Sequence, residues 1–377
     1  MAIFPALYKY ASAEIIPLDG EEEKRVRKIM KILILGVNGF IGHHLTNRIL
    51  ETTDWTVYGM DLGDDRLDRA LSNPRFHFLE GDIAINKEWI EYHVKKCDVI
   101  MPLVAIATPK LYVEDPIGVY NLDFEMNLNI IKQCVKYRKR VVFPSTSEVY
   151  GACPDPEFSE DESFLVVGPI QKERWIYSCC KQLLDRVIYA YGTRGHLEFT
   201  LFRPFNWVGP RLDSLFTAKE GSSRVVTQFI AELLMKRPIT LVDGGHQKRC
   251  FTYVDDGISA LMKILENKDD CCKNEIINIG NPENDCSVKE LAHLMKKIFM
   301  DHPRHRRDDE YSDIVEVPAV EFYGKGYQDI YTRKPSIAKA RKLLEWEPKI
   351  DLEDSLTRTI YSFLEENEAN PGTEDRR

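Results

Sequence analysis

The fold is decided by residues 31–42, which read KILILGVNGFIG. The run begins with five mostly apolar residues, which is typical of a buried strand in a parallel sheet. Three glycines follow with the spacing G-x-x-G-x-x-G, at Gly36, Gly39 and Gly42, before a helical stretch that extends to about Leu50. Glycine suits this turn because the chain turns tightly, its backbone must approach a pyrophosphate and the helix must pack closely on the strand. The pattern therefore predicts a dinucleotide-binding turn, with the amides at the helix N-terminus available to phosphates.

An acidic residue about 20 positions further along completes this pattern. Asp61 ends the next predicted strand, where a carboxylate accepts hydrogen bonds from both ribose hydroxyls and repels a 2′-phosphate. The nearest basic residue after it is Arg66, so we expect NAD rather than NADP as cofactor. An ordinary glycine-bearing turn between a strand and a helix is the alternative, and Asp61 in this position disfavours it.

Further cofactor contacts are expected from position alone. Asn38, Phe40 and Ile41 lie within the glycine-rich turn. Asp82 and Ile83 follow the third predicted strand, where they would hold the adenine. A simple turn residue is an equally supported interpretation of Asp82.

Strands and helices alternate along the first half of the chain. The expected strands are 31–35, 55–60, 76–79, 99–104, 140–143 and 199–202, and the main helices between them are 127–137 and 175–191. Nearly continuous apolar strands in this alternation predict an α/β Rossmann fold, a doubly wound parallel sheet with helices on both faces. The regularity fades beyond Pro204, which predicts a smaller C-terminal lobe that binds substrate. In that lobe, Ser287 and Glu290 predict a capping box at the start of a helix.

These patterns divide the chain into predicted parts. We expect an N-terminal extension at 1–29, the cofactor-binding domain at 30–203 and 246–268, the substrate-binding lobe at 204–245 and 269–365, and a disordered tail at 366–377. The polar stretch 301–313 is expected to be mobile and to become ordered with substrate.

Composition restricts the classes of protein to which the chain can belong. It has 377 residues, 51 basic and 60 acidic side chains, a formal net charge of −9 and 44% hydrophobic residues. These values are typical of a globular protein and exclude a disordered or collagen-like chain. The acidic balance disfavours nonspecific nucleic-acid binding, which needs a basic surface. No apolar window of about 18 residues occurs, so no membrane span is expected.

Cysteine and histidine spacings point to no metal site. The nine cysteines include no Cys-x-x-Cys motif, and we interpret them as reduced thiols of a cytoplasmic protein. The nine histidines show no zinc-ligand spacing, alone or with cysteines.

A Tyr-x-x-x-Lys motif supplies a candidate base. Tyr177 and Lys181 share one face of a predicted helix, because residues four apart lie one turn apart. A phenol has a pKa near 10, and both a nearby ammonium and a positively charged nicotinamide would lower it. Tyr177 could then take a proton while a hydride leaves the adjacent carbon. A surface pair is the alternative interpretation, which the glycine-rich turn disfavours.

Together with Ser145 and Thr146, these motifs resemble the extended short-chain dehydrogenase/reductase family. The resemblance implies that Thr146 hydrogen-bonds the reacting hydroxyl and that Tyr177 is the base. The run 144–151, PSTSEVYG, narrows the resemblance. UDP-glucuronate decarboxylases carry Ser-Glu at the positions of Ser147 and Glu148, whereas 4,6-dehydratases carry Asp-Glu and simple 4-epimerases usually lack the acidic residue.

Decarboxylation chemistry accounts for the Ser-Glu pair. Oxidation of a glucuronate at C4 places a ketone β to the C6 carboxylate, and a β-keto acid loses CO2 readily through an enolate. Ser147 can hydrogen-bond that carboxylate, whereas an aspartate would repel it. The resemblance assigns Glu148 and Arg333 to the carboxylate, the enolate and protonation of C5. A small loop residue and a structural carboxylate are the alternative interpretations of Ser147 and Glu148.

From about Met30 to Leu364 the chain is also similar to the dehydrogenase half of the bifunctional polymyxin-resistance enzymes of the 4-amino-4-deoxy-arabinose pathway. The similarity rests on long runs such as 91–99 (EYHVKKCDV), 203–211 (RPFNWVGPR) and 323–329 (YGKGYQD). It implies NAD-dependent oxidation and decarboxylation of UDP-glucuronate to a UDP-4-keto-pentose. Reduction of this ketone by the retained NADH would give UDP-xylose. A short extension stands here in place of the formyltransferase half.

The same resemblance implies a set of UDP-sugar contacts and a homodimer, whereas the acidic charge and the absence of a long apolar window disfavour nucleic-acid and membrane partners. The implied substrate contacts, besides Thr146, Ser147 and Arg333, are Ala107, Tyr112, Arg174, Asn206, Arg224, Lys248, Arg249 and Tyr327. Arg224, Lys248 and Arg249 suit a diphosphate, although each alone is more often a solvated surface charge. The helices 127–137 and 175–191 would form the dimer interface.

Other activities remain as alternatives at this point. A nucleotide-sugar 4-epimerase or 4,6-dehydratase would act on UDP-glucose, which lacks the carboxylate. A non-catalytic dinucleotide sensor is disfavoured because Thr146, Tyr177 and Lys181 are all present. Plant UDP-apiose/UDP-xylose synthases carry cysteines at the positions of Ala107 and Ser147, so ring contraction to apiose is not expected.

Overall fold

The computed structural model describes residues 29–215, 218, 223–303 and 313–369. The predicted extension 1–29 lies outside these residues except for Ile29, and so does most of the predicted mobile stretch 301–313.

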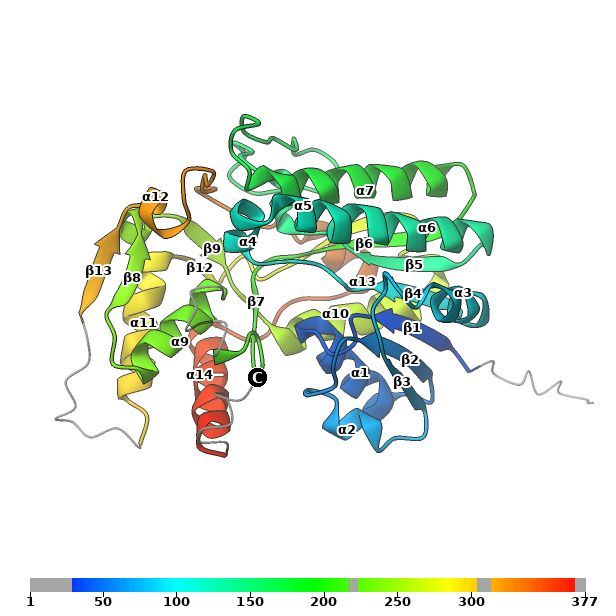
Figure 1. Cartoon of the computed structure of the whole chain (residues 1–377), viewed down its shortest axis with the longest axis horizontal. Helices are drawn as coiled ribbons and strands as arrows, with labels where there is room; N and C mark the ends of the chain where they lie inside the picture. Colours follow the sequence, from blue (N-terminus) through cyan, green and yellow to red (C-terminus); the bar gives the residue numbers. More distant parts are fainter. Residues whose placement is uncertain (1–28, 216–217, 219–222, 304–312, 370–377) are drawn as a thin grey trace, which may run out of the picture.

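A seven-stranded parallel sheet forms the larger part of the molecule (Figure 1). Its strands, in chain order, are β1 (Lys31–Leu35), β2 (Thr56–Asp61), β3 (Phe76–Glu80), β4 (Val99–Pro102), β5 (Arg140–Pro144), β6 (Glu198–Pro204) and β11 (Glu275–Ile279). In space they are ordered β11-β6-β5-β4-β1-β2-β3. The Rossmann fold and the six strands expected from the sequence are confirmed, with small shifts at the strand ends. The order reverses between β1 and β4, where open α/β sheets form their binding crevice.

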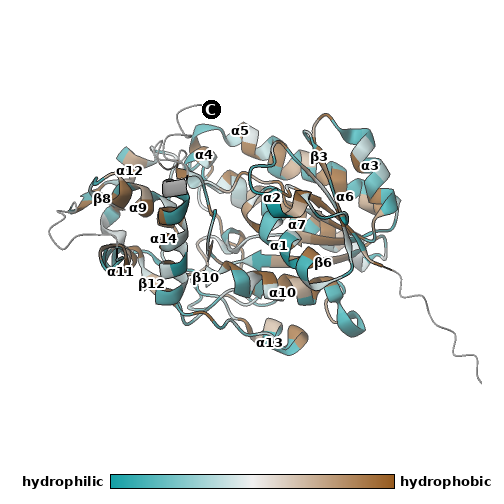
Figure 2. Ribbon diagram, turned by 90° about the horizontal axis from the view of Figure 1, so that it is seen from below, coloured by the Kyte–Doolittle hydropathy of each residue, from teal (hydrophilic) through white to brown (hydrophobic). Residues whose placement is uncertain are grey.

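Alternating residues of β1 explain why helices cover both faces of the sheet. Ile32 and Ile34 pack into one cluster with α1 (Phe40–Thr52) and α10 (Val254–Glu266). Leu33 and Leu35 point the other way, as neighbouring strand residues must. The helices on that second face are α3 (Lys87–Lys96), α6 (Asn127–Lys136) and α7 (Trp175–Thr193). The strands are mostly hydrophobic, and the flanking helices carry hydrophilic residues on their outer sides (Figure 2).

Both helices predicted for the dimer interface exist, and further helical segments precede α6. The chain after β4 forms α4 (Pro109–Glu114), α5 (Pro116–Val119) and a π-helix, η1 (Tyr120–Met126), which continues directly into α6. A π-helix is wider than an α-helix and often marks a functional site. Here η1 packs against α7, the helix that carries Tyr177 and Lys181.

The smaller lobe is built from short strand pairs and helices. Its pairs are β7 (Trp207–Val208) with β10 (Thr252–Tyr253), β8 (Ile239–Val242) with β13 (Ile314–Val317), and β9 (Lys248–Cys250) with β12 (Asp285–Ser287). Its helices are α9 (Val225–Leu234), α11 (Val288–Met300), α12 (Ala319–Phe322) and α14 (Leu352–Ala369). The predicted capping box at α11 is confirmed, since Ser287 Oγ accepts from the Glu290 amide at 3.1 Å and Glu290 Oε2 accepts from the Ser287 amide at 2.8 Å.

Remaining short elements connect these parts. They are α2 (Asp68–Leu71), α13 (Ala338–Leu344) and the 3-10 helices η2 (Ser147–Tyr150), η3 (Asp243–Gly245) and η4 (Lys268–Asp270). No helix in the described residues is both long enough and apolar enough to cross a membrane.

Three boundaries expected from the sequence differ from the structure. The strands β9 and β10 lie in the range 246–268 that is expected in the cofactor-binding domain, but they pair with strands of the lobe. The strand β11 joins the large sheet beside β6, although it lies in the range 269–365 that was assigned to the lobe. The helix α14 continues to Ala369, so residues 366–369 are not part of a disordered tail. Glu366 is anchored there, because Arg211 Nε lies 3.4 Å from its carboxylate. The rest of the predicted tail lies outside the described residues.

Candidate active site

A cavity of about 400 Å³ lies where the glycine-rich turn, the end of β5, α7 and the lobe meet. Seventeen of the predicted site residues line it, and they come from both parts of the chain. They are Gly36, Gly39, Phe40, Ile41, Gly42, Ala107, Tyr112, Thr146, Ser147, Glu148, Tyr177, Lys181, Asn206, Arg224, Arg249, Tyr327 and Arg333. The structure thus brings together residues that are far apart in the sequence, in a cavity large enough for a small-molecule ligand.

The glycine-rich turn has the shape that a dinucleotide requires. Gly36 has φ +86°, a left-handed conformation that side chains disfavour, and a Cβ on Gly42 would lie 2.4 Å from the Gly36 carbonyl oxygen. No side chain in the described residues caps the N-terminus of α1, so its first amides are available to a phosphate. The turn is therefore a cradle for a pyrophosphate, and its residues fit the expected cofactor.

Asp61 lies directly behind this cradle. Its Oδ2 accepts a hydrogen bond from the Asn38 amide at 2.8 Å, which brings the carboxylate to the turn. Burial raises the pKa of Asp61, and the amides of Leu62 and Asn38 partly oppose this effect. Asp82 Oδ1 accepts from the Ala84 amide at 2.8 Å, a local turn contact. The adenine contact of Asp82 and Ile83 stays a prediction.

The oxidation centre consists of Thr146, Tyr177, Lys181 and Asp123. Thr146 follows β5 and shares a hydrogen bond with the Tyr177 phenol. The Tyr177 ring stacks on Tyr112, with the ring centroids 4.6 Å apart. Lys181 Nζ donates to the Pro144 carbonyl at 3.3 Å and lies 3.5 Å from Asp123 Oδ1. Asp123, which comes from the π-helix η1, was not among the residues predicted from the sequence.

Tyr177 does not have the lowered pKa that the motif alone suggests. Burial raises the pKa of its phenol well above the ordinary value, the Asp123 carboxylate raises it further, and the Thr146 hydrogen bond opposes both. Lys181 Nζ lies 5.8 Å from the centroid of the Tyr177 ring and is paired with Asp123. The expected lowering of this pKa by Lys181 together with a bound nicotinamide stays a prediction, and in the protein on its own Lys181 is paired with Asp123.

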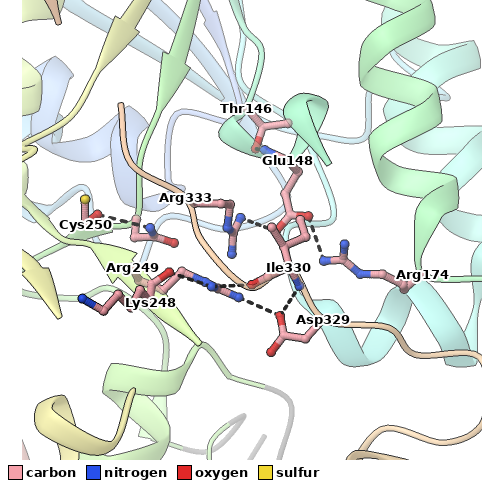
Figure 3. A network of polar contacts seen from close by, with 10 residues as sticks. Thr146, Glu148, Arg174, Lys248, Arg249, Cys250, Asp329, Ile330 and Arg333 are labelled. Carbon is pink, nitrogen blue, oxygen red and sulfur yellow. Dashed lines mark hydrogen bonds and ion pairs between the residues drawn. The ribbon is translucent and has the colours of Figure 1, made fainter. Parts of the chain in front are cut away.

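The arginine centre consists of Glu148, Arg174 and Arg333, and all three side chains are buried (Figure 3). Arg174 donates from NH2 to Glu148 Oε2 at 2.8 Å, and Arg333 donates from NH1 to Glu148 Oε1. Burial opposes ionisation of the carboxyl, but the two guanidinium groups prevail and lower the pKa of Glu148 to about 2. Glu148 is thus a carboxylate at neutral pH.

A second ion pair lies beside the arginine centre. Arg249 donates from NH2 to Asp329 Oδ1 at 2.6 Å and from NH1 to the Ile330 carbonyl at 2.7 Å. Because Asp329 is paired with Arg249, Glu148 alone balances two guanidinium groups. Nε and NH1 of Arg174 and Nε of Arg333 are buried with no hydrogen-bond partner in the described part of the chain. Uncompensated positive charge and free donors are what an anionic ligand group requires.

Lys248 does not belong to this group. Its Nζ lies 3.7 Å from the Asp285 carboxylate, and its side chain is half exposed and points away from Arg249 (Figure 3). Neighbouring residues of a strand point to opposite faces, and Lys248 and Arg249 are neighbours in β9. Arg224 lines the cavity but is paired with Asp213, with NH2 2.7 Å from Oδ1.

Several further residues of the site were missed. Tyr323 lines the cavity and stacks on Tyr327, with ring centroids 4.1 Å apart, and Asp329 orients Arg249. Tyr323 and Asp329 were not predicted, because they lie in a loop whose sequence shows no helical or strand period, whereas Tyr327 was implied by the resemblance. Ser147 is buried and lines the cavity at the start of η2. No group of three potential metal ligands occurs in the described residues.

Comparison with known proteins gives one family and several similar structures. The model of the NAD dependent epimerase/dehydratase family matches residues 32–280. The chain is 55% identical to the PbgP3 protein from Burkholderia pseudomallei, with a TM-score of 0.81 over 89% of this chain and 96% of that one.

Two more distant structures share the fold. UDP-glucose 4-epimerase from Thermotoga maritima, solved with UDP-glucose, is 24% identical, with a TM-score of 0.73 over 89% of this chain and 99% of that one. UDP-glucuronic acid 4-epimerase from Bacillus cereus, solved with UDP-glucuronic acid and NAD, is 23% identical, with a TM-score of 0.74 over 89% and 99%.

Proposed function

The chain belongs to the NAD dependent epimerase/dehydratase family and uses NAD, and we propose that it oxidises UDP-glucuronate at C4 and decarboxylates the product. The observation that supports this proposal is the arginine centre. Glu148 alone balances Arg174 and Arg333, and buried guanidinium donors beside it remain free. A uronate carboxylate supplies the missing negative charge, whereas the neutral hydroxymethyl group of UDP-glucose does not.

In this reaction the oxidation centre manages a proton. Thr146 hydrogen-bonds the C4 hydroxyl, and Tyr177 takes the hydroxyl proton. A bound NAD would supply the hydride acceptor for C4, so that the sugar would become a ketone. The cradle of Gly36, Gly39 and Gly42 would hold the cofactor pyrophosphate, and Asp61 would hold the ribose.

The arginine centre then promotes the loss of CO2. The C5–C6 bond breaks, CO2 leaves, and the electron pair stays on the sugar as an enolate, whose charge the guanidinium groups stabilise. Ser147 hydrogen-bonds the carboxylate before it leaves. Glu148 has no proton to give at neutral pH, because its pKa is about 2. We therefore assign protonation of C5 to Arg333 or to a water that it holds, and the role of Glu148 is to hold Arg174 and Arg333.

The nucleotide half of the substrate occupies the lobe side of the cavity. Arg224 and Arg249 offer guanidinium groups to the diphosphate, and Asn206 lines the same wall. The implied homodimer through α6 and α7 stays a prediction; Leu183 and Tyr189 on α7 are exposed in the single chain.

Product analysis by NMR tests the proposal. The full chain is incubated with NAD and either UDP-glucuronate or UDP-glucose, and CO2 and NADH are measured alongside. We expect CO2 and a UDP-pentose or UDP-4-keto-pentose from UDP-glucuronate, and no turnover of UDP-glucose. NADH formed one-for-one with CO2 identifies the ketone as product, whereas UDP-xylose without free NADH shows that the ketone is reduced again. Formation of the C4 epimer with its carboxylate intact would refute the decarboxylase and support a 4-epimerase.

A further inference from the structure

Asp123 is a buried carboxylate that the chemistry above does not use. It lies on η1 and is 0% exposed. Its Oδ2 accepts a hydrogen bond from the Ile106 amide at 2.9 Å, and its Oδ1 lies 3.5 Å from Lys181 Nζ. Burying a charge is costly unless the charge is paired, so the two groups stabilise each other. The wider π-helical turn of η1 carries Asp123 where it meets α7.

Charged and titratable groups surround this pair on several elements. They are Tyr177, Cys180 and Asp185 on α7, Glu148 on η2, Tyr112 on α4, and Arg224 before α9. Two of the carboxylates already have partners. Asp185 Oδ2 accepts from Ser145 Oγ at 2.6 Å and lies 3.4 Å from Arg203 NH2, and Glu148 is held by its two arginines. Asp123 is therefore the carboxylate in contact with Lys181 among the described residues.

The charge count explains what this contact does. With Lys181 positive and Asp123 negative, the oxidation centre is neutral while Tyr177 keeps its proton. Ionisation of Tyr177 would add a second buried negative charge against a single ammonium. The oxidised nicotinamide brings one positive charge, and the phenolate then restores neutrality.

We propose that Asp123 is a positioning residue, which holds the Lys181 ammonium against the Pro144 carbonyl and keeps Tyr177 protonated until the oxidised cofactor binds. The base is then active only in the loaded enzyme. Hydride transfer from C4 would remove the positive charge of the nicotinamide, and the proton that Tyr177 takes from the C4 hydroxyl then stays on the phenol. The inference rests on the proposed role of Tyr177 as the base.

Proton release on cofactor binding tests this inference without any substrate. The full chain, freed of cofactor, is titrated with NAD in weakly buffered solution at a series of pH values, and released protons are counted with a pH indicator. We expect the parent chain to release protons when NAD binds. Tyr177→Phe should lack the proton release that comes from this phenol. In Asp123→Asn, which keeps an oxygen for the Ile106 amide, the midpoint pH of release should fall by about one unit, the effect of removing a negative charge a few ångströms away.

Asp185→Asn is the matched control, because Asp185 is also a buried carboxylate on α7 near Lys181 but is paired with Ser145 and Arg203. Its midpoint should stay within about 0.3 units of the parent value, since its effect on Tyr177 is remote. The pH profile of kcat/KM for UDP-glucuronate should show the same pattern, with its rising limb at lower pH only in Asp123→Asn.

The outcomes distinguish a positioning role of Asp123 from a purely structural role and from a failure of the proposed function. An unchanged midpoint in a folded Asp123→Asn chain, or no proton release from the parent, would overturn the inference. If Asp123→Asn does not fold, Asp123→Ser provides the same test with a smaller uncharged side chain. Loss of the folded state in both would show a purely structural carboxylate and would also overturn it. Normal proton release without turnover of UDP-glucuronate would instead refute the proposed function and leave this inference standing.

Discussion

The two halves of the site bury charge in opposite ways. In the oxidation centre, one ammonium meets one carboxylate, and the neighbouring phenol stays neutral. In the arginine centre, one carboxylate pairs with two guanidinium groups, and several guanidinium N–H donors have no hydrogen-bond partner among the described residues. The first arrangement is complete without an anionic ligand, and the second is not. In the proposed function, the oxidation centre controls a proton and the arginine centre receives the anionic part of the substrate, and this difference in charge supports that proposal.

The two centres also differ in how they are assembled. The oxidation centre comes from residues 123–181, which belong to the sheet and to the helices that cover it. The arginine centre depends on Arg333, which lies 185 positions after Glu148 and comes from the loop that follows Tyr323. The arginine centre therefore depends on a long-range contact, whereas the oxidation centre depends on the domain core.

The largest effect is expected from Arg333→Gln. Removing one of the two guanidinium groups leaves Glu148 paired with Arg174 only, so the arginine centre becomes neutral like the oxidation centre. Loss of a partner from a buried charge pair costs about 2–5 kcal/mol, so kcat/KM for UDP-glucuronate should fall by about 10²–10³-fold. Steady-state CO2 release measures this change.

Cofactor affinity is the control for this variant. Arg333 lies in the arginine centre, so NAD binding measured by calorimetry should match that of the parent chain. A fall in kcat/KM of less than about fivefold, which corresponds to about 1 kcal/mol, would show that the excess positive charge does not receive the substrate.

How far the sequence predicts these two centres follows from the range of the contacts. The turn at Gly36 and the six apolar strands are local patterns, and both are observed. The strand β11 was assigned to the wrong part of the molecule, because its place beside β6 is set by the tertiary fold and not by its own five residues. The helix α14 continues past Glu366 to Ala369, although the polar composition of this end makes it appear disordered in the sequence; Arg211 Nε lies 3.4 Å from the Glu366 carboxylate there.

Within the site, the range of the contacts likewise separates the residues that the sequence can predict from those that it cannot. Asp123 could have been found, because it shares a helical period with Asn127, Ile130 and Cys134, all of which are buried. A carboxylate on the apolar face of a helix needs a partner, and Lys181 is that partner. Asp329 could not have been found this way, because its loop has no period and its role depends on contact with Arg249.

The next largest effect concerns stability against pH, where the two centres should have opposite signs. The pKa of Glu148 falls from 4.5 to about 2 in the folded protein, so its pairing contributes stability above about pH 4.5 that is lost as the pH falls toward 2. The loss is on the order of 3 kcal/mol.

Asp123 should behave in the opposite way. Burial raises the pKa of Asp123, so protonated Asp123 contributes stability to the folded protein. This contribution declines as the pH rises through the pKa of Asp123.

Unfolding by urea at a series of pH values between about 3 and 6 measures both slopes. Glu148→Gln should be less stable than the parent near neutral pH but should lose less stability on acidification. Asp123→Asn should lose more than the parent over the same range, because the opposing contribution is gone. Equal slopes in both variants would contradict the charge assignment of one of the centres.

The smallest effect is expected where the resemblance and the structure disagree. Lys248 was expected to bind the diphosphate, but its ammonium is half exposed and lies near Asp285 outside the cavity. Lys248→Ala should therefore change KM for UDP-glucuronate by less than about twofold, the range of a surface ion pair.

Arg249→Lys is the matched variant at the neighbouring position. Arg249 faces the cavity, and its guanidinium group holds Asp329 by a contact that an ammonium cannot reproduce. Arg249→Lys should raise KM by about tenfold, roughly the value of one charge-assisted hydrogen bond. A larger effect of Lys248→Ala than of Arg249→Lys would contradict this assignment. Strand β9 would then have to turn its other face to the substrate. The positive charge that binds the substrate would lie further from Glu148 than the arginine centre requires.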